Sequence, residues 1–320
     1  MMHGFKRTTA AVMALVLMLA VGISYGEEGS KGILYKAENG GVTVYLLGSI
    51  HVGNDEMYPL GEAIEKAMEQ ADIFVFECDT ASKDAGRAAQ ELMYYAGDGH
   101  MMEAISPATY QKLEAVCSQT GQNLQGIARM RPWAAMTHFS RFVTVAELGV
   151  DNEASAIALG VESVVSSYAA KNKKALEYLE NTRGQLETFD RMSPALQEYL
   201  LDEALTIILN PELIQGMDAT IREWPGWWKD GKNVAFADAY RKSYLQNQQD
   251  EKMTVLFAEY HETFMTTRNQ TMTDIIEGYL RGEEEHTYFI TVGLLHLVLP
   301  EDSIVQRLED RGFTVDYLGE

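Results

Sequence analysis

Residues 44–51 read VYLLGSIH, an apolar run of the β type that breaks at Gly48 and places His51 three residues later. The same pattern returns near the end of the chain, where residues 287–296 read TYFITVGLLH and His296 follows a glycine at the same spacing. The chain holds only seven histidines. Two histidines in matched contexts therefore predict one site, which forms when the two ends of the chain meet in one sheet.

Further apolar runs around the first segment predict the rest of this sheet. Residues 33–35 and 42–47 flank a Glu-Asn-Gly-Gly turn, which is typical of a hairpin. An amphipathic helix is expected at 60–68, and a strand buried on both faces is expected at 73–76. A strand, a helix and a strand in so short a segment predict a βαβ unit with a right-handed crossover.

The middle of the chain, residues 85–280, carries an almost entirely helical pattern. Ser-Pro pairs at 106–107 and 193–194 place serine at a helix cap and proline at the first helical position. After this region the sequence returns to strand, helix and strand. We therefore expect an α/β fold over 32–318, with a mixed β-sheet core formed from the N- and C-terminal parts and a large helical insertion.

The N-terminal segment, residues 1–26, has the features of a secretory signal. Lys6 and Arg7 precede an uncharged apolar stretch that ends in small residues. We expect an exported protein, periplasmic or secreted, with no stable membrane anchor after cleavage. An uncleaved anchor is the alternative.

The mature chain is strongly acidic. Removing Lys6 and Arg7 from the 26 basic residues leaves 24 against 47 acidic residues, a net charge of about −23. This charge argues against nucleic acid or an anionic membrane surface as a partner, because both would be repelled.

Cys78 and Cys117 are the only two cysteines. In an exported protein they are candidates for one disulfide. Cys78 lies inside a segment whose pattern predicts a buried strand, so an apolar core thiol is the equal alternative.

Three side chains are expected where strands end: His51, Glu77 and His296. Ligands of open α/β sheets bind beyond the carboxyl ends of the strands. Two imidazoles and a carboxylate suit Zn, Mn, Fe or Co, with open positions for water or substrate. Glu77 can instead act as a general base beside the metal. The alternative for either histidine is a hydrogen-bonded structural role.

Gly48 and Gly293 are expected to let the chain leave its strand in a backbone conformation that residues with a Cβ do not adopt. They are also expected to permit close approach of the backbone.

The chain resembles the TraB/PrgY/GumN family, to which the Wnt-cleaving Tiki proteases are related. The family has two Gly-x-x-His motifs and an intervening glutamate, matched here by residues 48–51, Glu77 and residues 293–296. More specific matches are YLLGSIHVG at 45–53, YPL at 58–60, MRPW at 130–133, Arg268-Asn269, and VGLLHLV at 292–298. The resemblance covers nearly the whole mature chain. It implies the fold of a divalent-metal-dependent peptidase or hydrolase, which is also similar to the haem-binding ChaN and erythromycin-esterase groups.

Gly149-Val150-Asp151 and Leu179-Glu180 match patterns that are frequent in the family, but Asn172-Lys173 stands where the family has Gly-Lys. The resemblance therefore leaves a site role for Asp151 or Glu180 open. It does suggest that Arg268 and Asn269 face the site, whereas their polar neighbours alone indicate a solvated helix face.

Arg131 can hold a substrate carboxylate or an oxyanion through its fixed fork of donors. An ion pair that docks the helical region onto the sheet is the equal alternative.

The first functional hypothesis is an exported, metal-dependent hydrolase, a peptidase acting on a peptide or protein substrate. His51, Glu77 and His296 would bind Mn, Co or Zn, and Arg131 would stabilise charge in the transition state. The second is an esterase-like hydrolase without metal, in which a histidine activates water and Glu77 orients it. The third is a non-catalytic protein that sequesters a peptide, haem or a metal.

Overall fold

The computed structural model describes residues 29–150, 152–215, 221–247 and 251–319. The predicted signal at residues 1–26 and Asp151 lie outside these ranges. Within the described ranges, no helix combines the length and the apolar character that crossing a membrane requires.

Six strands form one mixed sheet in the order β4-β3-β5-β2-β1-β6. They are β1 (Ile33–Asn39), β2 (Val42–Ser49), β3 (Ile73–Phe76), β4 (Ala175–Tyr178), β5 (Thr287–Gly293) and β6 (Val315–Tyr317). β4, β3, β5 and β2 run parallel, while β1 is antiparallel to both of its neighbours. The C-terminal β5 lies between the N-terminal β2 and β3. The expected α/β fold with a mixed sheet is therefore confirmed.

The hairpin of β1 and β2 has the expected local cause. Asn39 pairs with Val42 across a turn in which Gly40 has a φ of 60°, a value that favours glycine. Beyond the turn, β2 buries consecutive residues, and Leu46 and Leu47 are both fully buried. A strand covered on both faces needs such a continuous apolar run.

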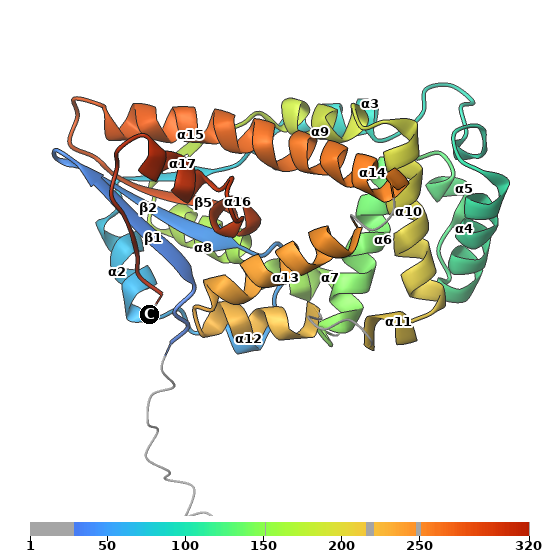
Figure 1. Ribbon diagram of the computed structural model, residues 1–320, viewed down its shortest axis with the longest axis horizontal. Helices are drawn as coiled ribbons and strands as arrows, with labels where there is room; N and C mark the ends of the chain where they lie inside the picture. The colour runs from blue at the N-terminus through green and yellow to red at the C-terminus, as the bar shows by residue number, and fades with distance from the viewer. Residues whose placement is uncertain (1–28, 151, 216–220, 248–250, 320) are drawn as a thin grey trace, which may run out of the picture.

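Helices cover both faces of the sheet (Figure 1). α2 (Glu62–Gln70) and α8 (Val161–Lys171) lie on one side, and α15 (Thr267–Leu280) and α17 (Ile304–Asp310) lie on the other. α2 turns Ile64, Ala67 and Met68 inward, the spacing of one helical face.

A second hydrophobic core lies among the helices at the far end from the sheet (Figure 1). The helices of this region are α3 (Lys83–Leu92), α4 (Pro107–Thr120), α5 (Leu124–Ile127), α6 (Pro132–Glu147), α9 (Thr182–Asp190), α10 (Pro194–Leu209) and α14 (Glu251–His261). Ser106 and Ser193 cap α4 and α10, each accepting a backbone hydrogen bond. The helix starts predicted from the Ser-Pro pairs are thus confirmed.

Further elements complete the described part of the chain. They are η1 (Asp55–Met57), η2 (Met101–Glu103), α7 (Glu153–Ala158), α11 (Glu212–Gln215), η3 (Ile221–Glu223), α12 (Trp224–Lys229), α13 (Asn233–Asn247) and α16 (Leu295–Val298). In α12, Trp228 is fully buried and its indole N–H donates to the carbonyl of Gly48 over 2.8 Å. This tryptophan therefore packs against the sheet.

The helical prediction for residues 85–280 misses β4, which pairs in parallel with β3. All four residues of β4 are exposed, so its sequence lacks the apolar run that revealed the buried strands. These four residues form a strand because they pair with β3 in the folded protein.

One continuous helical segment runs along most of the molecule in Figure 1 and contributes to both the core around the sheet and the core among the helices. It consists of α14, the π-helical turn η4 (Glu262–Thr266) and α15. A π turn shifts the faces that follow it, and such turns are frequent at functional sites. Arg268 and Asn269 come directly after it.

Cys78 and Cys117 are both free thiols in this structure. Cys117 is buried in α4, and Cys78 donates from Sγ to Gln185 Oε1 over 3.0 Å. The disulfide alternative is therefore not realised here.

Candidate active site

The sheet places the three predicted side chains at one rim. His51 follows β2, Glu77 follows β3 directly, and His296 lies in α16, just after β5. Because β2, β5 and β3 are adjacent and parallel, their carboxyl ends meet at the same edge.

Glu77 accepts three hydrogen bonds through its carboxylate. The Gly293 N–H donates to its Oε1 over 2.6 Å, while Arg268 and Gln185 donate to its Oε2 over 2.6 and 2.9 Å. Its side chain is 12% exposed. Burial alone would raise the pKa of Glu77, but the positive charge of Arg268, with smaller contributions from His296, His51 and the Gly293 N–H, lowers it to about 2. Glu77 is therefore a firmly held carboxylate.

Arg268 is the cation at the centre of the site. Its guanidinium donates to Glu77 over 2.6 Å and to Glu180 over 2.8 Å, and a further N–H approaches Nε2 of His296 at 3.2 Å. Burial alone would lower the pKa of Arg268, but the charges and hydrogen bonds of Glu77 and Glu180 raise it. One guanidinium thus joins two carboxylates and an imidazole.

His296 is buried and has a defined tautomer. Nδ1 lies 2.5 Å from Oδ1 of Asn269, whose amide nitrogen donates to the carbonyl of Asp302. Since Oδ1 only accepts and the Arg268 guanidinium only donates, Nδ1 carries the proton and Nε2 holds the lone pair. Burial, assisted by Arg268, lowers the pKa of His296 to about 4. The ring is therefore neutral at physiological pH.

His51 forms a separate pair with a residue of α8. Nδ1 lies 2.8 Å from Oε1 of Glu162, and the same oxygen accepts a hydrogen bond of 2.7 Å from Ser49. The His51 side chain is 78% exposed. The charge of Glu162, and then its hydrogen bond, raise the pKa of His51 to about 9. A carboxylate that holds one ring nitrogen, with the ring open to solvent, is the arrangement of histidines that transfer protons.

The two parts of the site influence each other electrostatically. The positive charge of His51 helps to lower the pKa of Glu77, and Glu77 helps to raise that of His51. The rim therefore combines an exposed imidazole–carboxylate pair with a buried carboxylate–arginine network.

As arranged, these atoms do not fit a divalent cation. Among the described residues, no cluster of three or more histidine, cysteine or acidic side chains has the arrangement to hold a metal ion. Arg268 already binds Glu77 and approaches Nε2 of His296, while Nδ1 of His51 faces Glu162. Metal ligation by His51, Glu77 and His296 stays a prediction, and it requires Arg268 to move.

At the two motif glycines, Gly48 and Gly293, other parts of the chain come closer than a side chain would allow. Neither Gly48 nor Gly293 has a positive φ, so the expected special conformation is wrong for both. A Cβ on Gly48 would lie 3.1 Å from Cα of Leu294, and a Cβ on Gly293 would lie 3.3 Å from Oε1 of Glu77. The second glycine thus lets its backbone N–H reach the carboxylate.

Arg131 is not brought into this set. It donates to Asp190 over 3.0 Å and lies over the ring of Tyr95, and Trp133 donates to the same Asp190 carboxylate. The ion pair of the alternative is present, but it joins α6 to α9 within the helical region and does not join this region to the sheet. Its catalytic role stays a prediction.

Sequence reasoning missed Glu162 and Gln185, and it left the role of Glu180 open. Glu180 follows the unrecognised β4, and the other two lie on helices whose register against the sheet has no local signal. The solvated-face interpretation of Arg268 and Asn269 is wrong, since Asn269 is fully buried and the Arg268 side chain is 12% exposed. The suggestion from the resemblance that both face the site agrees with their contacts.

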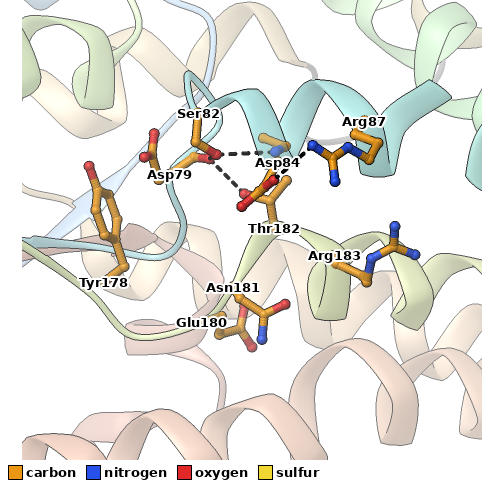
Figure 2. A pocket seen from close by; sticks show the side chains of 10 residues that line it. Asp79, Ser82, Asp84, Arg87, Tyr178, Glu180, Asn181, Thr182 and Arg183 are labelled. Atoms are coloured by element: carbon orange, nitrogen blue, oxygen red, sulfur yellow. Dashed lines mark hydrogen bonds and ion pairs between the residues drawn. The ribbon is translucent and has the colours of Figure 1, made fainter. Parts of the chain in front are cut away.

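A cavity of about 520 Å³ opens beside this network (Figure 2). Tyr178 and Glu180 line it from the end of β4, and Arg87 and Arg183 line it from two helices. Glu180 belongs to both the cavity wall and the Arg268 network. The cavity therefore borders the buried charge network at Glu180.

A protein-family model described as the TraB/PrgY/gumN family matches residues 33–317. No curated protein matches the chain, and no solved structure matches it.

Proposed function

Because this chain belongs to the TraB/PrgY/gumN family, we propose that the rim is the active site of a hydrolase that cleaves peptide bonds. The His51–Glu162 pair beside the Glu77–Arg268 network carries this proposal. The resemblance to the Tiki proteases supports peptides as the substrate class.

His51 is the proton-transfer group of this proposal. Glu162 fixes Nδ1, and no hydrogen bond to Nε2 occurs among the described residues, so Nε2 can face a substrate. Nε2 takes a proton from a water molecule whose oxygen attacks the peptide carbonyl carbon. The C–N bond then breaks, and the same proton passes to the leaving nitrogen. A raised pKa makes His51 a strong base once it is neutral.

Glu77 and Arg268 orient this reaction. A carboxylate offers about four lone-pair positions, and three donors reach Glu77. The remaining position on Oε1 can accept a hydrogen bond from the attacking water. Arg268 holds Glu77, Glu180 and His296 in fixed positions and is therefore a positioning residue.

A metal-dependent peptidase is the second candidate, and the state of His296 favours it. Asn269 fixes Nδ1–H and leaves a neutral imidazole whose Nε2 lone pair faces Arg268, and a second group that fixes Nδ1–H is common in histidines that bind metals. His296, Glu77 and His51 would hold Mn, Co or Zn after displacement of Arg268. Such an ion would lower the pKa of bound water.

A digest of a peptide library tests the proposal. We expect cleavage by the wild type with and without a chelator, and loss of cleavage with His51→Gln. His286→Gln is the matched control, because this histidine lies at the opposite end of β5. Loss of cleavage with the chelator, together with Mn, Co or Zn in elemental analysis of untagged protein, would favour the metal-dependent candidate. Binding of peptide, or of haem with a Soret band, without any cleavage would favour sequestration.

Export is proposed on the sequence of residues 1–26. Fractionation of cells that express the full chain, with mass spectrometry of the N-terminus, tests this proposal. Mature protein that begins near Glu27 in the exported fraction is the expected result.

A further inference from the structure

β4 is an edge strand that ends at the proposed active site. It pairs with β3 on one side and is the first strand of the sheet order. The pairing extends beyond the strand, because the Leu179 N–H donates to the Phe76 carbonyl and the Glu180 N–H donates to the Glu77 carbonyl. The backbone that follows the edge therefore runs into the network of Glu77 and Arg268.

The outer edge of β4 offers unpaired peptide groups. The peptide groups of a strand point alternately to its two sides. Since Leu179 donates toward β3, Glu177 and Ala175 also face β3, and Leu176 and Tyr178 face outward. No strand pairs with this outer side in the described ranges. These groups are the template that an added strand needs.

The side chains of the same two residues form an exposed apolar pair. Leu176 is 42% exposed and Tyr178 is 39% exposed, and their spacing of two puts them on one face of the strand. Glu177 lies on the other face, where Tyr279 donates to its carboxylate over 2.8 Å. An extended peptide beside β4 would cover the apolar pair with its own side chains.

The cavity of about 520 Å³ lies where β4 ends (Figure 2). Tyr178 lies at one end of the view, and Arg87 and Arg183 lie at the other. A peptide that leaves the strand edge would enter this space, and Glu180 in its wall binds Arg268. The opposite edge strand, β6, contributes no residue to the lining of this cavity.

We propose that β4 binds the substrate as an added strand: an extended polypeptide segment pairs with Leu176 and Tyr178 and enters the active site through the adjoining cavity. This inference rests on the proposed peptidase function, and it adds the conformation in which the substrate is recognised. Substrates would be unfolded segments or flexible termini, because a folded helix cannot form this pairing.

Two substitutions at one position test the pairing. Leu176→Pro removes the outward N–H without disturbing the inner ladder, since proline is tolerated at such edge positions. Leu176→Thr keeps the N–H and removes most of the apolar surface. With oxidised insulin B chain as the probe, we expect Leu176→Pro to lower kcat/KM about tenfold and Leu176→Thr to lower it about twofold. Equal melting temperatures would show that both variants are folded.

Hydrogen exchange of the wild type provides a second measurement. With the same probe we expect slower exchange at the amides of Leu176 and Tyr178. Cleavage with equal effects of the two variants and no protection would overturn the strand pairing and leave the peptidase intact. Protection that Leu176→Pro abolishes, without any cleavage, would support the pairing and overturn the peptidase. If neither cleavage nor protection occurs, the inference is wrong.

Discussion

Arg268 and Glu77 stand 191 positions apart in the chain, yet their side chains form an ion pair of 2.6 Å with 12% exposure on each partner. Burying one charge without the other would be costly, so each side chain depends on its partner. The pair joins α15 to the end of β3. Together with the contacts of Arg268 with Glu180 and of Asn269 with His296, it attaches α15 to the rim of the active site.

Removing Arg268 should therefore destabilise the protein strongly. Arg268→Ala leaves Glu77 and Glu180 as buried charges without their partner, and we expect a loss of about 3–5 kcal/mol in the free energy of unfolding. The control is Arg281→Ala, whose 57%-exposed side chain pairs with Glu277 and should contribute less than about 1 kcal/mol. Denaturant unfolding measures both. Equal effects would contradict the central role of this cation.

The same residue should control metal binding. If the guanidinium takes the place of an ion, Arg268→Gln should bind Co²⁺ at least about tenfold more tightly than the wild type, because carboxylates and an imidazole become available. Calorimetry and the visible spectrum of Co²⁺ report the binding, and His296→Gln in the Arg268→Gln background should remove it. Tight binding by the wild type that His51→Gln weakens would instead support the metal-dependent candidate.

Glu162 should set the pH dependence of activity. The proposed base works when His51 is neutral, so kcat/KM of the wild type should rise with pH up to about 9. Glu162→Gln removes the charge that favours the protonated ring, and the rise should move toward the ordinary imidazole pKa of about 6.5. NMR titration of His51 measures the shift without relying on activity. An unchanged titration would exclude Glu162 as its cause.

The lowered pKa of Glu77 should make the free energy of unfolding depend on pH in the acidic range. Its pKa is lowered to about 2 in the folded state from an ordinary value of 4.5. A lowered pKa stabilises the folded state above pH 4.5, and this contribution is lost as pH falls toward 2. The contribution is about 3 kcal/mol, from 1.36 kcal/mol for each pH unit. Unfolding measured between pH 6 and 2 should be less pH-dependent for Glu77→Gln than for the exposed control Glu309→Gln.

Gly293 should tolerate no side chain. The Cβ of Gly293→Ala would lie 3.3 Å from Oε1 of Glu77 and 3.6 Å from Cδ2 of His296, so the carboxylate has to shift. We expect a large loss of kcat and destabilisation of about 1–3 kcal/mol. Gly278→Ala is the control, since its Cβ meets nothing within 4 Å and alanine favours the helix. Full activity of Gly293→Ala would exclude the close approach as a catalytic requirement.

Local sequence was sufficient wherever neighbouring residues carry the cause. The hairpin turn at Gly40, the buried run of β3 and the helix starts at Ser106 and Ser193 all follow from backbone preference, apolar patterning or capping. The sequence also placed His51, Glu77 and His296 at strand ends, because polar residues after apolar runs mark those ends. It could not find β4, whose exposed residues carry no apolar pattern.

The sequence by itself determined every strand of the sheet except β4, the polar residues where three of them end, and the family to which the chain belongs. Tertiary structure alone decided that Glu162 holds His51 and that Arg268 lies between Glu77, Glu180 and His296. The physical reason is that a buried charge is stable only beside its partner, and these partners meet through strand order and helix register. The repeated Gly-x-x-His pattern marks where the site lies, while folding supplies the charges that define its chemistry.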